Sequence, residues 1–393
     1  MAVPGPQRYA SGGRKLGVDP TTLEHALVAM ARLRATDARI TPVLTLRHFA
    51  ALTDLPYGFL RGAVGRQSYP PYRFVYLKKR IPGRTGLRMI SIPPNSLMKA
   101  QRWLVEHVLR YTEAHPASYA FHPDSSPVQA AEQHPNTRWL LKVDIEDFFH
   151  SVREREVAAI FTRIGFQKLV AFEFARLCTI AVDRGPGANP APRTEPITIY
   201  ASGFEGMLPQ GAPTSPMLAN LAMARTDATL AALAAERGFR YSRYADDLAF
   251  SSTADRTLFE MRALQREVCR ILNEAAFRPN LRKTVIRGPG SRRIVLGLLV
   301  DGPTPRLSQA FRDNLRLHLH YLGDPAFGPA RHALARKTGI SSLYHQLRGL
   351  IGWAQQVEPA YGRRLLEAFE AVDWPPAQPR RIEGSGAAGD PFT

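Results

Sequence analysis

The stretch that most constrains the fold of this chain is residues 240–252, which read Arg-Tyr-Ser-Arg-Tyr-Ala-Asp-Asp-Leu-Ala-Phe-Ser-Ser. Two β-prone flanks enclose Ala245, Asp246 and Asp247, a pattern that predicts a β-hairpin with adjacent carboxylates at its tip. Like charges so close together repel and raise each other's pKa unless a cation lies between them. The pair therefore indicates a site for a divalent metal ion, and the alternative is a solvated acidic loop.

A further candidate ligand follows a hydrophobic segment. Residues 140–143 predict a buried strand, and Asp144 stands at its end. A carboxylate in that position is costly to bury unless a counter-ion accompanies it. Three carboxylates from a strand and an adjacent hairpin could hold two metal ions for the in-line attack of a hydroxyl on phosphorus.

Charge and cysteine content narrow the class of protein. The 393 residues include 52 Lys and Arg against 34 Asp and Glu, a formal charge of +18 that suggests a polyanionic partner, with nucleic acid the obvious candidate. A basic ribosomal-type or membrane-surface protein could share this balance, but the chain has no run of about 18 apolar residues and no apolar signal core. The two cysteines are too few for a zinc cluster or a disulfide framework, so a reducing cytoplasm fits.

Three other segments have clear patterns. Residues 72–92 carry several cations and no acidic residue, which predicts a basic hairpin that could grip phosphates or simply be solvated. A long helix is predicted to begin at a cap formed by Thr214 or Ser215 and to end at Gly238. Residues 294–300 predict one hydrophobic strand.

Six short motifs occur in order along the chain. They are the segment from Lys-Lys-Arg at 78–80 to Arg-Met-Ile-Ser-Ile-Pro at 88–93, Gln-Arg-Trp at 101–103, Asp-Ile-Glu-Asp-Phe-Phe-His-Ser at 144–151, Leu-Pro-Gln-Gly-Ala-Pro-Thr-Ser-Pro at 208–216, Tyr-Ala-Asp-Asp-Leu at 244–248 and Asn-Leu-Arg-Lys-Thr at 280–284. This set resembles the motifs of the retron-type reverse transcriptases, over nearly all of residues 45–375. The resemblance implies an α+β right-hand polymerase with fingers, an antiparallel-sheet palm of ferredoxin or RRM-like form, and a helical thumb.

Composition, periodicity and the resemblance together divide the chain. The start is rich in Gly, Pro and Arg, which predicts a flexible N-terminus or an RNA-touching arm, and helical periodicity predicts a helical N-terminal unit after it. We expect fingers with inserts, a palm, a helical thumb and a disordered tail to follow. The predicted ranges are 1–18 for the flexible N-terminus, 19–66 for the helical N-terminal unit, and 67–138 with 153–206 for the fingers and inserts. The palm is predicted over 139–152 with 207–303, the thumb over 304–375 and the disordered tail over 376–393.

Carried over by position, the resemblance assigns the catalytic residues. It implies that Asp144, Asp246 and Asp247 bind two Mg²⁺ ions, for which Mn²⁺ could substitute. The carbonyl of Ile145 is an additional candidate ligand.

Two residues are implied to select the incoming nucleotide. Phe149 resembles the steric gate that stacks under the sugar and excludes a 2′-hydroxyl, although an aromatic residue there could instead pack in the core. Gln210 resembles the residue that touches the incoming nucleotide and the template base.

Three cationic side chains are implied to contact the phosphates of the incoming nucleotide. Lys79 and Arg88 resemble the fingers cations on the triphosphate, and Lys78 or Arg80 could replace Lys79 if the register of the hairpin differs. Lys283 resembles a lysine near the pyrophosphate that could act as a general acid, and the alternative is a solvated surface lysine.

The end of the chain, from residue 347 to residue 374, resembles the retron thumb and implies RNA contacts by Arg348 and Trp353. Two positions depart from the family pattern. Ala130 stands where these enzymes usually have Asn, and Leu296 stands where they tend to have Thr. Both departures affect which subfamily the resemblance implies. The absence of Asn at position 130 also affects how the enzyme would select its RNA.

The resemblance implies a cytoplasmic bacterial enzyme that copies part of a bound, structured non-coding RNA into single-stranded DNA from dNTPs. It further implies a role in anti-phage defence with a separate effector protein, and no membrane partner. The alternatives are a defence-associated or group II intron-derived reverse transcriptase, and a non-catalytic RNA-binding scaffold.

Overall fold

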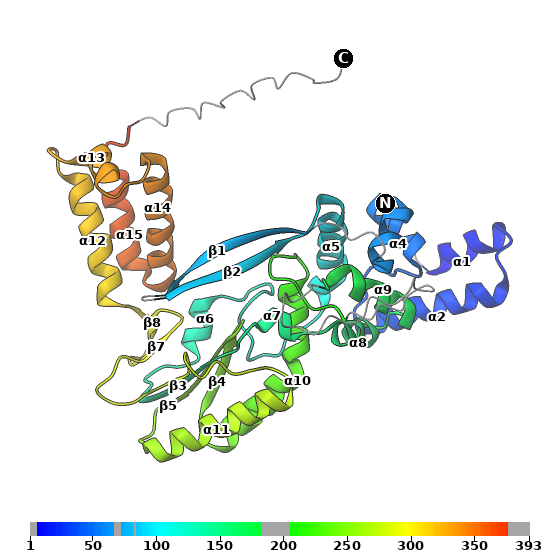
Figure 1. Cartoon of the computed structure of the whole chain (residues 1–393), viewed down its shortest axis with the longest axis horizontal. Helices are drawn as coiled ribbons and strands as arrows, with labels where there is room; N and C mark the ends of the chain where they lie inside the picture. The colour runs from blue at the N-terminus through cyan, green and yellow to red at the C-terminus, as the bar shows by residue number, and fades with distance from the viewer. Residues whose placement is uncertain (1–5, 67–71, 82–83, 182–204, 376–393) are drawn as a thin grey trace. The chain divides into compact units, whose positions relative to one another are not determined.

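The computed structural model describes residues 6–66, 72–81, 84–181 and 205–375, which belong to two compact units, Met1–Arg293 and Ile294–Thr393 (Figure 1). The second unit begins at Ile294, ten residues before residue 304, where the thumb was expected to begin. The expected disordered tail, 376–393, lies outside the described residues.

Four helices open the first unit: α1 (Pro6–Lys15), α2 (Pro20–Thr36), α3 (Leu46–Thr53) and α4 (Tyr57–Gly65). Asp19 begins α2 by accepting a hydrogen bond from the Thr22 N–H, and Thr45 begins α3 by accepting one from the His48 N–H. Helix α1 lies where we expected a flexible N-terminus. It packs against α2 and buries Ala10 (Figure 1). Contact between the two helices therefore orders a segment whose composition alone predicts no regular structure.

The basic segment forms the expected hairpin. Strands β1 (Arg73–Ile81) and β2 (Arg84–Ile92) pair antiparallel from Arg73 opposite Ile92 to Ile81 opposite Arg84. The hairpin leads into α5 (Asn95–His107) and the short 3₁₀ helix η1 (Leu109–Tyr111).

A four-stranded antiparallel sheet forms the centre of the first unit. Its strand order is β4-β5-β3-β6. The strands are β3 (Trp139–Asp144), β4 (Arg240–Tyr244), β5 (Asp247–Ser252) and β6 (Val285–Arg287). The predicted strand before Asp144 and the predicted hairpin around Asp246 are thus confirmed, and the strand and the hairpin are direct neighbours.

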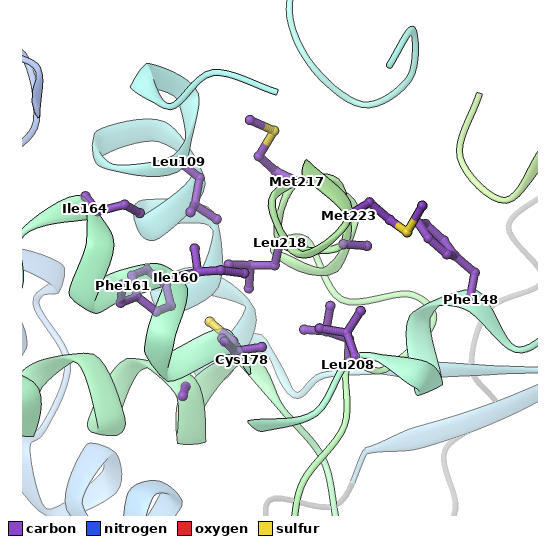
Figure 2. Packing of buried hydrophobic residues seen from close by; sticks show 14 of the residues in the cluster. Leu109, Phe148, Ile160, Phe161, Ile164, Cys178, Leu208, Met217, Leu218 and Met223 are labelled. Carbon is purple, nitrogen blue, oxygen red and sulfur yellow. The ribbon is translucent and has the colours of Figure 1, made fainter. Parts of the chain in front are cut away.

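The helices that follow α5 in the first unit are α6 (Pro127–Glu132), α7 (Phe148–Ser151), α8 (Glu154–Ile164), α9 (Lys168–Cys178), α10 (Ser215–Glu236) and α11 (Leu258–Glu274). Helices α6 and α10 pack against strand β4, while α8 and α9 pack against each other, with α8 also against α10 and α9 against α4 and α5. Figure 2 shows Leu218 of α10 pointing toward Ile160 and Phe161 of α8, and Met223 toward Phe148 of α7. Helix α10 begins and ends within two residues of its predicted bounds.

The second unit combines a small sheet with a helical bundle. Its strands are β7 (Ile294–Val295), β8 (Leu298–Leu299) and β9 (Arg306–Leu307), and its helices are α12 (Gln309–Gly323), α13 (Gly328–Ala335), α14 (Ile340–Val357) and α15 (Pro359–Glu370). The prediction of one strand over 294–300 was wrong. Leu296 and Gly297 have φ of 49° and 87°, so the chain turns back there as a tight hairpin.

No helix within the described ranges is both long enough and apolar enough to cross a bilayer.

Candidate active site

Sheet pairing brings the predicted carboxylates together. Asp144 is the last residue of β3 and Asp247 is the first of β5, and the two are register partners. Ala245 and Asp246 form the turn between β4 and β5, with Ala245 at φ 55°. The carbonyl of Asp246 accepts a hydrogen bond of 3.0 Å from the N–H of Ile145. All three carboxylates therefore lie at one end of the sheet.

The electrostatics of this end favour a cation. Burial and the charges of Asp247 and Asp144 raise the pKa of the Asp246 carboxyl. Burial, together with the charge of Asp144, also raises the pKa of Asp247. Carboxylates that repel one another in a half-buried place are stabilised by any positive charge between them.

In this structure a lysine supplies positive charge at Asp144. The Lys283 ammonium donates to Oδ1 of Asp144 over 2.7 Å, while the Asn280 side-chain amide donates to Oδ2 over 3.0 Å. Burial lowers the pKa of Lys283, but its hydrogen bond to Asp144 and the three nearby carboxylates outweigh that effect and raise it. The Asn280-Leu-Arg-Lys283 motif thus reaches the carboxylates, as a site lysine would.

The carboxylates fit a hard divalent cation by their chemistry, because Mg²⁺ prefers oxygen donors and their repulsion favours positive charge. However, among the side chains that the structure describes, no three of His, Cys, Asp or Glu are arranged to hold a metal ion. Both oxygens of Asp144 are hydrogen-bonded to Lys283 and Asn280, so the set is not a preformed cage.

A buried hydrogen-bond network anchors the turn that carries Asp246. Arg243 forms two hydrogen bonds with Asp227, of 2.8 and 2.7 Å, and neither side chain is exposed. Its Nη1 also donates to Oδ1 of Asn220 over 2.9 Å and to the carbonyl of Ala245 over 3.0 Å. The backbone that carries Asp246 is therefore bound directly to the core through one guanidinium.

The sequence interpretation missed this network. Arg243 lies in the quoted hairpin and Asp227 on the predicted helix, but neither was singled out. The available signal was an Asp on a long, otherwise largely apolar helix, since a buried carboxylate needs a partner.

Gln210 lies beside strand β2. Its carbonyl accepts a hydrogen bond of 2.7 Å from the Ser91 N–H, and its side chain is half-buried. Gly211 follows with φ 118°, and a Cβ at this position would lie 2.7 Å from Ile90 Cγ2 and 3.0 Å from the Ser91 carbonyl oxygen. Only glycine allows the turn to come so close to the hairpin.

Phe149 lies in α7, five residues after Asp144. It is half-buried, and its ring centroid lies 5.5 Å from that of Phe148 and 6.0 Å from that of Phe121. Phe148 is 4% exposed and fills the core position, as expected, which leaves Phe149 at the edge of the core.

Comparison with known proteins agrees with these motifs. Residues 77–323 match the family model described as reverse transcriptase (RNA-dependent DNA polymerase). The chain belongs to the reverse transcriptase family. Members of this family are RNA-directed DNA polymerases that use divalent metal ions, and the mixed helix and sheet content agrees with the expected α+β class.

Curated relatives of this reverse transcriptase are of the retron type. The retron Ec86 reverse transcriptase of Escherichia coli is 26% identical over 298 residues, which cover 75% of this chain and 84% of that protein. The retron Mx65 reverse transcriptase of Myxococcus xanthus is 31% identical over 291 residues, which cover 74% of this chain but only 63% of the relative. The predicted retron-type membership is confirmed.

Among solved structures, telomerase from Candida albicans in complex with the TWJ fragment of telomeric RNA matches with a TM-score of 0.40 and 11% identity. That match covers 82% of this chain and 59% of the telomerase chain.

The remaining predicted site residues of the reverse transcriptase lie on other elements. Arg88 is exposed on β2. Lys79 lies on β1 opposite Gly86, and its side chain is outside the described part of the structure, as are those of Lys78 and Arg80. Their roles on the triphosphate stay predictions.

The two residues predicted to bind RNA belong to the second unit. Arg348 is exposed on α14, and Trp353 is half-buried on the same helix. Their contacts with RNA also stay predictions.

Ala130, the first position that departs from the family pattern, lies in the interior of the protein. Ala130 in α6 is completely buried, so no solvent-facing side chain stands at the place of the usual Asn. Nearby His134 is also buried, with Nδ1 2.6 Å from the Ser251 hydroxyl and Nε2 2.7 Å from the Ser242 hydroxyl. In this chain the segment joins α6 to β4 and β5.

Proposed function

We propose that this reverse transcriptase is the polymerase of a bacterial retron and copies part of a bound, structured non-coding RNA into single-stranded DNA. The observation that carries the proposal is the pairing of Asp144 with Asp247, with Asp246 in the adjacent turn. Three acidic side chains at one end of a sheet suit a reaction in which negative charge accumulates on phosphorus.

We assign two Mg²⁺ ions to Asp144, Asp246 and Asp247, with the Ile145 carbonyl as a further ligand and Mn²⁺ as a substitute. When bound, such ions lower the pKa of the attacking hydroxyl and neutralise the leaving pyrophosphate. Lys283 forms an ion pair with Asp144 over 2.7 Å, which places its ammonium among the three carboxylates. In this proposal the Lys283 ammonium would donate a proton to the leaving pyrophosphate.

We further assign the dNTP contacts to the β1–β2 hairpin and the two segments beside it. Lys79 and Arg88 bind the triphosphate, Gln210 contacts the base pair and Phe149 stacks under the sugar. The hydrogen bond between Ser91 and Gln210 supports this grouping, because it ties the strand that carries Arg88 to the Gln210 turn.

In this proposal the four-stranded sheet is the palm, the β1–β2 hairpin belongs to the fingers, and helices α12–α15 form the thumb. The expected ranges are kept, with fingers over 67–138 and 153–206, palm over 139–152 and 207–303, and thumb over 304–375. Arg348 and Trp353 on α14 then contact the template RNA.

We place the activity in the bacterial cytoplasm and in anti-phage defence, together with a separate effector protein. The support is the similarity to retron reverse transcriptases, two of which are named above.

The test is to purify the protein from its native locus and to digest the bound nucleic acid separately with RNase and DNase, beside the variant Asp246→Ala. We expect a short, discrete DNA linked to RNA in the wild type and none in the variant. If RNA copurifies without a defined DNA, yet a supplied RNA template and primer are extended with dNTPs and Mg²⁺, the enzyme is a reverse transcriptase of another kind. If RNA copurifies but no defined DNA appears and the supplied primer is not extended, the chain is a scaffold that binds RNA.

A further inference from the structure

Phe121, in the loop between η1 and α6, has an unusual backbone. Its φ is +68°, in the left-handed region, and its side chain is 41% exposed. A bulky side chain is rare in this region, because the Cβ crowds the following carbonyl, and glycine is the favoured residue there. A strained residue of this kind persists only when its surroundings hold it, and such residues cluster at functional sites.

The loop around Phe121 is held on both sides. The Asn220 side-chain amide donates to the carbonyl of Ala120 over 2.5 Å, and its Oδ1 accepts from the Ser118 hydroxyl over 3.1 Å. After Phe121, the Nε2 of His122 is hydrogen-bonded to the carbonyl of Ser118 over 2.7 Å. The strained backbone is therefore fixed in place by side chains before and after it.

The same anchor reaches the catalytic turn. Oδ1 of Asn220 also accepts from Arg243, which donates in turn to the carbonyl of Ala245. Asn220 thus ties the Phe121 loop and the turn that carries Asp246 to one point on α10. An ordinary surface loop would not need its position fixed against the carboxylates.

The ring of Phe121 is directed to Phe149. Their centroids are 6.0 Å apart with planes at 42°, and the ring of Phe148 lies 5.5 Å from that of Phe149. Phe148 is buried in the core whereas Phe121 is 41% exposed, so Phe121 contacts Phe149 from a more exposed position. Removal of the Phe121 ring would therefore take away packing from this side of Phe149.

We propose that Phe121 is a positioning residue for Phe149 and thereby helps to determine which sugar the enzyme accepts. The inference rests on the proposed function, in which Phe149 stacks under the sugar of the incoming nucleotide. A ribonucleotide differs by one hydroxyl, and a gate excludes it only while its ring cannot move aside. By filling the space beside Phe149, Phe121 keeps the gate closed to that hydroxyl.

The test measures kcat/KM for a dNTP and for the matching rNTP in single-nucleotide extension of a primed RNA template. We expect Phe121→Gly to lower the preference for dNTP about tenfold or more, mainly by raising kcat/KM for the rNTP. Glycine suits φ +68°, so this variant removes the ring while relieving the backbone. Phe121→Tyr keeps the ring and should keep the wild-type preference.

Three further variants make the result specific. Phe149→Ala should lower the preference, and the double variant should lower it no further, because both residues act through one ring. Phe259→Ala removes a more exposed aromatic ring, on α11, and should leave the preference unchanged.

The inference is overturned if Phe121→Gly discriminates as the wild type does, if its effect persists in full in the Phe149→Ala background, or if Phe259→Ala has the same effect. In these cases the polymerase activity still stands. If the wild type extends the primer with neither nucleotide, the proposed function fails, and this inference fails with it.

Discussion

Arg243 and Asp227 form a two-point ion pair with no exposed surface on either side chain. Such a pair adds little net stability compared with apolar residues, but removing one partner leaves a buried charge uncompensated. Because Arg243 also donates to the carbonyl of Ala245, the pair links the stability of the first unit to the position of Asp246.

We therefore predict two separable effects at this pair. Arg243→Met should lower the free energy of unfolding by about 3–5 kcal/mol, because Asp227 is left charged and buried. The double variant with Asp227→Leu should regain most of that stability but not the DNA synthesis, because the Ala245 carbonyl still lacks its donor. Urea unfolding and primer extension measure the two effects.

The control for this pair is Arg270→Ala, which breaks an exposed pair with Glu274 on α11. It should cost less than about 1 kcal/mol. Recovery of full activity in the Arg243 and Asp227 double variant would show that the ion pair has no positioning role.

Lys283 should contribute to the chemical step rather than to folding. Its side chain is 54% exposed and bonded to Asp144, so Lys283→Ala should lower the single-turnover rate about 10²-fold, as expected for loss of a general acid. The neighbouring Arg282 is also exposed, and Arg282→Ala should change that rate less than threefold, a modest effect expected for a surface residue. Equal rates for the two variants would assign Lys283 to the solvated surface.

The turn after Gln210 should tolerate no side chain at Gly211. We expect Gly211→Ala to destabilise the protein by about 2–3 kcal/mol, because the left-handed φ and the close approach to Ser91 both oppose a Cβ. The KM for dNTP should also rise, since the backbone of Gln210 is bonded to β2.

Gly58 provides the matched comparison in the same unit. It lies in α4, and a Cβ there would meet nothing within 4 Å. Gly58→Ala should leave stability unchanged or raise it by up to about 1 kcal/mol. Thermal unfolding of both variants decides the matter, and a Gly211→Ala variant as stable as Gly58→Ala would contradict the proposed contact.

His134 should make stability depend on pH. Burial, and to a smaller extent the charge of Arg240, lowers its pKa from 6.5 to about 3, so the folded chain keeps it neutral while the unfolded chain protonates it below 6.5. Stability is then lost as pH falls from 6.5 toward 3, by about 2 kcal/mol at pH 5.

The measurement is urea unfolding between pH 5 and 8 for the wild type and for His134→Gln. The variant lacks the titrating group, so its free energy of unfolding should depend less steeply on pH, with a slope that corresponds to up to one proton fewer taken up on unfolding. This difference in slope is expected whatever the absolute stability of the variant. His318, with a pKa lowered to about 4, titrates in both proteins and does not affect the difference. Parallel slopes would mean that His134 is not held neutral.

Local patterns were sufficient to predict the elements that carry the carboxylates. Alternation around Asp246 and the apolar run before Asp144 indicated a hairpin and a strand, and both exist. The long helix also followed from its cap and its terminal glycine. What these patterns could not supply was pairing between distant segments, such as Arg243 with Asp227 or His134 with two serines.

Two errors have the same origin. The first residues were expected to be flexible because they are rich in Gly, Pro and Arg, yet packing against α2 orders α1. The segment 294–300 was taken as one strand because it is hydrophobic, yet Leu296 occupies a left-handed position before Gly297. Composition and periodicity describe local preference, and in both places a tertiary contact or a turn prevails over it.

The position of β3 in the sheet also affects how the chain is made. Its partner strands β5 and β6 follow it by roughly 100 residues or more, which a ribosome adds in about 5–20 s. During that time an apolar strand has neither neighbour, and its unpaired edges are open to other chains. The carboxylates cannot meet until the sheet closes, so a truncated product that ends before residue 247 carries an aggregation-prone strand and no assembled site.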